Sequence, residues 1–208
     1  MEPERPRHAY ESGLHRRQGK ALTNFQRTLP SPQSDLAQQI LKDPYNFDFL
    51  TLSKDAHEKE LEAGLIEHIR KFLLELGVGF AFLGSQYPLE VSGKEYRLDL
   101  LFYHVKLHAY VIIDLKMSEF KPEYAGKMNF YLSAADDMLK QPMDMPTIGI
   151  ILCKGRDQLT VEYALRDLAK PLGVAEFRYL ERLPDEFKGS LPTIEELEAE
   201  LGKSGRRE

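Results

Sequence analysis

The chain has 208 residues, 42% of them hydrophobic, and a net charge of -5, values that suit one globular domain with tails and are small for two domains. The single cysteine, Cys153, excludes an internal disulfide and a cysteine-based zinc site. No run approaches the roughly 20 apolar residues of a membrane helix, and the N-terminus is too polar for a secretory signal. We therefore expect a soluble, cytoplasmic protein that has no membrane partner.

The two termini differ from the middle of the chain in charge and in proline content. Residues 1–33 are polar and hold four prolines, and the first 30 residues carry six Arg or Lys against three acids. The last residues are rich in glutamate. We predict a basic, largely flexible arm over residues 1–33, a folded domain over residues 34–185, and an acidic C-terminal helix or tail over residues 186–208.

The first elements of the predicted domain are helical. A short helix over residues 34–43 ends at Pro44, and residues 45–52 are extended and aromatic and pack on the domain from outside. A long helix over residues 55–76 follows, in which apolar side chains recur at helical spacing and Gly77 supplies the end.

Strands dominate the middle of the chain. Short turns join three of them into an antiparallel meander, at residues 78–91, 95–104 and 109–117. The remaining predicted elements are a helix, a buried strand, a helix and a last strand, at residues 122–140, 147–153, 160–170 and 175–180. This order predicts an α/β fold.

Two acids stand where the second and third strands enter the core. Asp114 and Lys116 share a face of their strand because side chains alternate, and pairing through the short connection brings Asp99 of the preceding strand near Asp114. Two adjacent carboxylates repel each other unless a cation lies between them. A hard cation such as Mg²⁺ takes such oxygen ligands, and a neighbouring lysine can assist a water or stabilise charge on phosphorus. The alternative is a solvated Asp–Lys pair at a strand end.

The helix over residues 55–76 offers a third acid. At about 100° per residue, Glu62 falls inside the apolar stripe, whereas Glu60 and Glu67 fall on the opposite face. Glu58 also lies within the arc, but it precedes the first apolar residue, so we expect it to be exposed. A buried carboxylate needs a partner, which favours Glu62 as the helix acid of the site; the alternative is an acid at the rim of the stripe that reaches water.

A Glu on the first helix, an Asp on the second strand and Asp-x-Lys on the third resemble the PD-(D/E)XK nuclease superfamily. The segments LEAGLIEHIRKFLLELG, YRLDLLFYHVKLHAYVIIDLKM and PTIGIILCKGRD are similar to the C-terminal domain of the YhcG-like nuclease family of bacteria. The resemblance implies a restriction-endonuclease-like αβββαβ core, with a central mixed sheet of four to five strands flanked by helices. The segment LHRRQGKALTNF resembles the end of the family's N-terminal helical domain, so a missing helical domain or partner chain, or a homodimer, could complete the protein.

The resemblance also assigns roles at the site. Asp99, Asp114 and Glu62 would hold Mg²⁺ or Mn²⁺, and Lys116 would be the catalytic lysine. The proline of the superfamily motif is absent, since Leu98 precedes Asp99. The activity implied is metal-dependent hydrolysis of phosphodiester bonds in DNA.

Further residues are candidates for contacts to the substrate. Gln86 resembles the family's GxQ wording, although an ordinary strand-end amide is the alternative. Lys121, Lys127 and Tyr131 lie in a helix that contributes phosphate contacts in this superfamily; solvated lysines and a core tyrosine are the alternatives.

Other functions find less support in the sequence. His104 and His108 have no further metal ligand nearby in the sequence, Cys153 is expected to be a small buried apolar side chain, and no glycine-rich phosphate loop is present. Two rival hypotheses remain. One is an inactive nucleic-acid-binding module that keeps the fold, and the other is a scaffold that presents the aromatic residues 45–52 to a partner chain.

Overall fold

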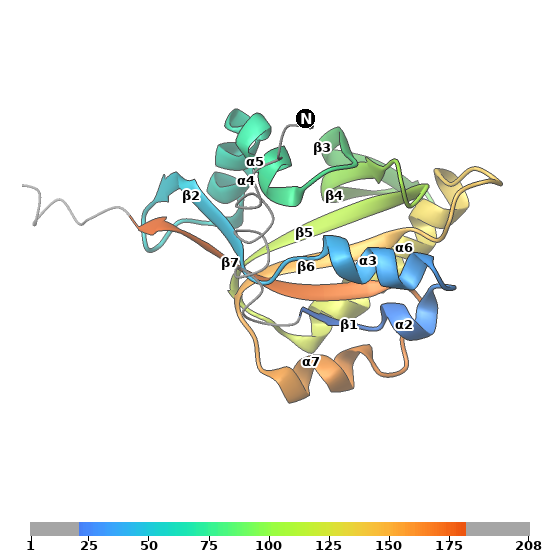
Figure 1. The fold of residues 1–208 in the computed structure, drawn as a ribbon. Coiled ribbons are helices and arrows are strands. Elements are labelled where there is room, and N and C mark those ends of the chain that lie inside the picture. The colour runs from blue at the N-terminus through green and yellow to red at the C-terminus, as the bar shows by residue number, and fades with distance from the viewer. Residues whose placement is uncertain (1–20, 182–208) are drawn as a thin grey trace, which may run out of the picture.

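The structure, a computed structural model, describes residues 21–181, which fold around one mixed β-sheet (Figure 1). Within this range seven strands pair in the order β1-β7-β6-β5-β4-β3, and β2 pairs with β7 outside that path. The strands are β1 (Leu22–Thr23), β2 (Tyr45–Leu52), β3 (Phe80–Val91), β4 (Lys94–His104), β5 (Ala109–Glu119), β6 (Ile148–Gly155) and β7 (Leu172–Glu181). The helices are α2 (Phe25–Thr28), α3 (Gln33–Ile40), α4 (Glu58–Glu67), α5 (Ile69–Leu76), α6 (Pro122–Met138) and α7 (Gln158–Leu165).

The connections between strands explain why the sheet is mixed. Strands β3, β4 and β5 form the antiparallel meander that the sequence predicts. Strands β5, β6 and β7 are parallel, because α6 and α7 carry the chain back between them. The predicted α/β fold with a central mixed sheet flanked by helices is confirmed. The sheet is wider than the four to five strands expected, since β1 and β2 both pair with β7.

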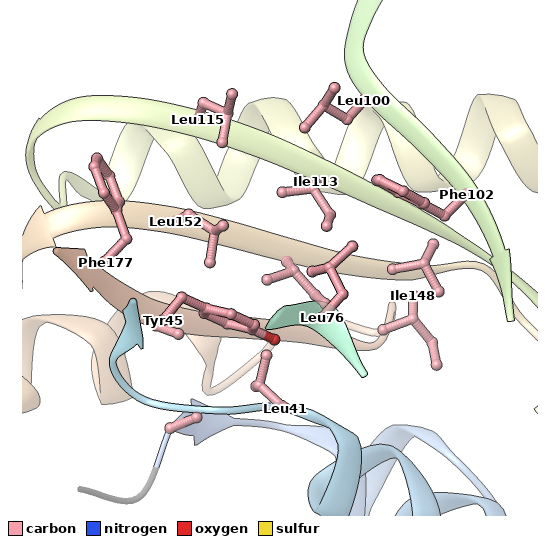
Figure 2. Packing of buried hydrophobic residues seen from close by; sticks show 14 of the residues in the cluster. Leu41, Tyr45, Leu76, Leu100, Phe102, Ile113, Leu115, Ile148, Leu152 and Phe177 are labelled. Atoms are coloured by element: carbon pink, nitrogen blue, oxygen red, sulfur yellow. The ribbon is translucent and has the colours of Figure 1, made fainter. Parts of the chain in front are cut away.

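Apolar side chains cover the sheet on both faces. Ile113 and Leu115 face the larger cluster, which includes side chains from α4, α5 and β2 (Figure 2). Ile112 and Ile151 face the opposite cluster, against α6 and α7. Strand β5 is thus buried on both sides, as its continuous apolar run predicts. A charged group on β5 consequently lies in surroundings that penalise an unpaired charge.

The helix predicted over residues 55–76 is in fact two helices. The α4 helix begins after His57, whose backbone N–H donates to Glu60 Oε2 at 2.8 Å. His68 stands between α4 and α5 with φ -105° and ψ 33°, outside helical values. Both helices bury apolar side chains against the same cluster, so the apolar spacing continues across the break and does not reveal it.

Residues 21–33 belong to the folded domain and not to a flexible arm. Phe25 of α2 is 1% exposed within the core, and Asn24 Nδ2 donates to the Lys170 carbonyl at 3.0 Å. The predicted arm is therefore wrong for this stretch, because α2 buries Phe25 and the two-residue strand β1 pairs with β7, which the polar composition around them conceals. Residues 1–20 and the predicted acidic tail at 186–208 lie outside the described residues.

Candidate active site

Strands β4 and β5 separate at the two predicted acids. They are paired as far as Leu100 and Ile113, and no pair between them follows in the described sheet. Asp99 and Asp114 are the next residues of the two strands, so they face the start of the gap. The Leu115 N–H donates to Asp99 Oδ2 at 2.9 Å, where a strand carbonyl would otherwise accept. The structure thus brings Asp99 and Asp114 together, as the hairpin register predicted.

Burial and a neighbouring carboxylate both disfavour the negative charge of Asp99. Burial raises the pKa of the Asp99 carboxyl from 3.8 to about 6, and the charge of Asp114 adds to the increase. The Leu115 N–H and the ammonium groups of Lys116 and Lys127 act in the opposite direction. A buried carboxyl with a raised pKa beside a second carboxylate is a feature of functional sites.

Asp114 and Lys116 form a buried ion pair on one face of β5. Their exposed fractions are 2% and 5%, and Lys116 Nζ lies 2.7 Å from Asp114 Oδ2. Lys116 Nζ also donates to the Leu115 carbonyl at 2.9 Å. A buried pair of this kind is costly to break from one side, because the remaining charge would be unpaired. The solvated strand-end pair considered from the sequence is excluded by this burial.

Helix α6 brings a second lysine to the site. Lys127 Nζ lies 3.5 Å from Asp114 Oδ1 and 5.2 Å from the centre of the Tyr131 ring. Tyr131 is 5% exposed and belongs to the apolar core, so it supports Lys127 and has little surface for a substrate. Lys121 is exposed at the residue before α6. Of these three residues, the structure places only Lys127 against the acids.

Helix α4 presents Glu62 toward the sheet, as its predicted phase requires. Gln86 Nε2 donates to Glu62 Oε2 at 2.6 Å, and burial raises the pKa of the Glu62 carboxyl while this hydrogen bond opposes the increase. Glu67 is exposed. The helical phase predicted from the sequence therefore distinguishes the partly buried Glu62 from the exposed Glu67. The partner of Glu62 is the side-chain amide of Gln86.

Gln86 reaches Glu62 from an unusual backbone conformation. Its φ is +46°, in the left-handed region that few non-glycine residues adopt. The pairs on either side, Ser85–Leu100 and Tyr87–Leu98, place Gln86 opposite Asp99 on the neighbouring strand. Gln86 therefore connects α4 to the strand that carries the first acid, which is more than an ordinary strand-end amide does.

Glu58 is a residue of the site that the sequence argument missed. Its carboxylate is half exposed, as expected, yet Oε2 lies 3.8 Å from Lys116 Nζ. The sequence does place it on the face of Glu62, four residues earlier, and it is set aside there because it precedes the first apolar residue of the helix. Helix α4 consequently directs two carboxylates toward the sheet.

The two aspartates fit a hard divalent cation. Asp114 Oδ2 is buried and, apart from the ion pair with Lys116, accepts no hydrogen bond from the described residues. Mg²⁺ commonly uses one or two protein carboxylates and takes its other ligands from water and substrate. Asp99 and Asp114 therefore supply the carboxylates that such an ion takes from the protein. Over residues 21–181, no three His, Cys, Asp or Glu side chains are grouped to hold a metal, so Glu62 as a third ligand stays a prediction.

His104 and Cys153, which the sequence analysis also considered, are buried in the fold. His104 is fully buried, and its Nδ1 accepts from the Leu107 N–H at 3.2 Å. Cys153 is fully buried, and burial raises the pKa of its thiol to about 12, which confirms the expectation of a small apolar side chain. Among the described residues, no helix is both long and apolar enough to span a membrane.

Comparisons with known proteins identify a family and a relative of this chain. The family described as the YhcG PDDEXK nuclease domain matches residues 38–192. A protein named "Putative nuclease YhcG", from Escherichia coli (strain K12), is 37% identical over 162 residues, which are 78% of this chain and 43% of that protein. The chain thus spans less than half the length of this relative.

Two solved structures align with part of the chain. A repair endonuclease from Pyrococcus abyssi aligns with a TM-score of 0.39 and 17% identity, over 61% of this chain and 49% of that one. A structure of EndoMS in complex with double-stranded DNA aligns with a TM-score of 0.42 and 15% identity, over 66% of this chain and 49% of that one.

Proposed function

Because the chain belongs to the YhcG PDDEXK nuclease domain family, we propose that this nuclease domain hydrolyses phosphodiester bonds in DNA with a bound Mg²⁺ or Mn²⁺. One observation carries the proposal. Two carboxylates of neighbouring strands, Asp99 and Asp114, meet where their strands separate, with the Lys116 ammonium 2.7 Å from Asp114. This set of groups matches what hydrolysis of a phosphodiester needs.

Each residue has a role in this proposal. Asp99 and Asp114 would hold the cation. Glu62 would be a further ligand of the cation, or the acid that orients Gln86 beside it. The cation supplies Lewis-acid stabilisation of the phosphate oxygens. Lys116 orients the attacking water and stabilises the charge that develops on phosphorus.

Contacts to the substrate are assigned to side chains around the aspartates. Lys127, partly exposed beside Asp114, and the exposed Lys121 would bind backbone phosphates. Gln86, opposite Asp99, would contact a phosphate or a water at the site. Tyr131 contributes through Lys127, since its own ring is buried.

The proposed activity also suggests which partners the domain has and where in the cell it acts. DNA is the substrate partner that we propose, and an N-terminal helical domain, a partner chain or a second copy of the chain would add to the binding surface. We place the protein in the cytoplasm, where chromosomal and foreign DNA of bacteria are both accessible.

The experiment is a paired measurement on the wild-type chain and Asp114→Ala. Isothermal calorimetry with Mn²⁺ and Mg²⁺ reports binding of the cation, and nicking of supercoiled plasmid reports the chemistry, with single-stranded DNA and RNA as further substrates. We expect Asp114→Ala to abolish both signals, because the cation loses one of its carboxylate ligands. The variant leaves the buried Lys116 with the partly exposed Glu58 as its remaining ion-pair partner among the described residues, so we expect a lower melting temperature, and a melting curve checks that the variant is folded.

Two outcomes would contradict the proposal. Wild-type nicking rates in Asp114→Ala would remove this aspartate from the site. Wild-type protein that binds DNA but neither binds the metal nor cleaves would instead support an inactive binding module that keeps the fold.

A further inference from the structure

The ammonium of Lys116 is held by groups from three elements. Within β5, Asp114 Oδ2 and the Leu115 carbonyl lie 2.7 and 2.9 Å from Nζ. From α4, Glu58 Oε2 lies at 3.8 Å, and from α6 the centre of the Tyr124 ring lies at 5.4 Å. Because Lys116 is only 5% exposed, its charge depends on these groups and little on water.

The two carboxylates near Lys116 differ in freedom. Asp114 is 3% exposed in its side chain, whereas 49% of the Glu58 side chain is exposed. Glu58 is the first residue of α4, where the helix dipole favours a negative charge, and it can approach Nζ without disturbing the core. Within the described residues, Asp114 and Glu58 are the only carboxylates in ion-pair distance of Lys116.

A divalent cation on Asp114 would compete directly with Lys116. Both are positive, and both would need the oxygens of one buried carboxylate. Without a second anion, binding of the metal would leave the lysine charged and unpaired in a buried position, at a large cost. The neighbouring acid on α4, Glu62, already accepts the hydrogen bond of Gln86, so Glu58 is the acid that remains for the lysine.

We infer that Glu58 is a positioning residue that takes over the ion pair of Lys116 when a divalent cation occupies Asp114. This inference rests on the proposed function, since it assumes a cation at the aspartates. Glu58 does not bind the metal; it lowers the cost of metal binding by receiving the displaced ammonium, and it keeps that ammonium beside the phosphate.

The consequence is a dependence of metal affinity on a residue that is not a ligand. With Glu58→Gln, Asp114 is the one carboxylate of the described residues that remains in ion-pair distance of Lys116, beside the Leu115 carbonyl and the Tyr124 ring. The metal must then displace the lysine from Asp114 with no second carboxylate to receive it, so we expect Mn²⁺ affinity to fall about tenfold, in the range of coupling between contacting charges. With Lys116→Met, the ammonium that would have to move to Glu58 is absent, while Lys127 stays 3.5 Å from Asp114 Oδ1 in every variant of the comparison. In that background, Glu58→Gln should leave Mn²⁺ affinity unchanged.

The test is a double-mutant cycle measured by Mn²⁺ calorimetry on wild type, Glu58→Gln, Lys116→Met and the double variant. Glu67→Gln, an exposed acid on the same helix, is the matched control and should bind as the wild type does. Thermal melting without metal checks that each variant is folded, and Lys116→Gln repeats the cycle if the methionine variant does not fold. Glu58→Asp, which keeps the charge, should restore part of the lost affinity.

Each possible result bears on either the inference or the proposed function. A tenfold loss that vanishes without Lys116 supports the inference. A loss of equal size in both backgrounds would make Glu58 a metal ligand, and unchanged affinity in Glu58→Gln would leave it no role; either result overturns the inference while the proposed function stands. Wild-type protein that binds no Mn²⁺ would instead refute the proposed function itself.

Discussion

Asp99 lies close to Asp114 in buried surroundings that disfavour the negative charge of Asp99, whereas Asp114 is paired with Lys116 and Lys127. Burial and mutual repulsion raise the pKa of Asp99 to about 6, while Lys116 and Lys127 supply partial compensation through Asp114. Such an arrangement is unfavourable for the free protein and is retained where function requires it. Removal of the Asp99 charge should therefore have opposite effects on stability and on activity.

Asp99→Asn tests this opposition through pH. Because the pKa of Asp99 is raised in the folded protein, its proton binds the folded state more tightly, and the resulting stabilisation is complete below 3.8 and is lost as pH rises through about 6. Asparagine does not ionise, and its side-chain oxygen can still accept from the Leu115 N–H. We expect the variant to melt a few degrees above the wild type at pH 8 in EDTA.

Melting curves from pH 4 to pH 8 provide the check. The difference between the variant and the wild type should shrink toward pH 4, and Mn²⁺ at pH 8 should raise the melting temperature of the wild type alone. A difference that does not change with pH would show that the ionisation of Asp99 is not its cause.

Lys116→Met separates the chemistry from metal binding. The lysine is proposed to assist the water and not to bind the cation, so its loss should lower the rate of plasmid nicking by at least about 100-fold. Mn²⁺ affinity should stay equal or rise, because the ammonium no longer competes for Asp114. Calorimetry and single-turnover cleavage on one preparation make the comparison, and weakened metal binding would mean that Lys116 chiefly maintains the shape of the site.

At the scale of the element, α4 determines which acids can reach the sheet. Glu62 faces the sheet and contacts Gln86, whereas Glu67 is exposed. We expect Glu62→Gln to weaken Mn²⁺ binding or cleavage by about an order of magnitude, as loss of a group next to metal ligands does, and Glu67→Gln to change neither. If Glu67→Gln weakened Mn²⁺ binding or cleavage and Glu62→Gln did not, the metal would lie on the opposite face of α4 from the one proposed.

The sequence predicts elements whose signals are local. The meander, α6 and the alternation that joins Asp114 to Lys116 all follow from periodicity and short turns. The pairing of β2 with β7 could not be predicted in this way, because Tyr45 and Phe177 are partners across most of the chain. The break at His68 is hidden by continuous apolar spacing.

At the site, too, local contacts can be predicted from the sequence and long-range contacts cannot. Asp99 and Asp114 are joined by one hairpin, so their proximity follows from register alone. The contact between Glu58 and Lys116 depends on how α4 docks on the sheet. That docking is a tertiary property, and the apolar stripe gives the orientation of the helix but not its position along its axis.

At the scale of the whole molecule, the charge is distributed unevenly along the chain. Residues 1–20 carry five Arg or Lys in a protein of net charge -5, and DNA affinity depends largely on neutralised phosphates. We predict that deletion of residues 1–20 weakens binding to duplex DNA and flattens its salt dependence, which has a slope of about -0.9 per phosphate contact. The cut must precede residue 21, because Phe25 lies in the core.

Fluorescence anisotropy on labelled duplex at several salt concentrations measures this effect. The melting temperature should stay nearly constant, since the buried residues of the domain are retained, and deletion of residues 186–208 serves as the acidic control. Equal salt slopes for the full and shortened chains would assign the DNA contacts to Lys121, Lys127 and Gln86 instead.

The separation of β4 from β5 also affects how the protein can evolve. The carboxylates of Asp99 and Asp114 are positioned by the pairs that precede the gap, up to Leu100 and Ile113. Strands β3 and β4 continue past this point as a hairpin that closes at Ser92 and Gly93. Insertions or deletions at that tip would change how far the hairpin extends beyond Asp99 and Asp114 while the spacing of the acids stays the same, so selection can alter the length of the hairpin and leave the geometry of the acids intact.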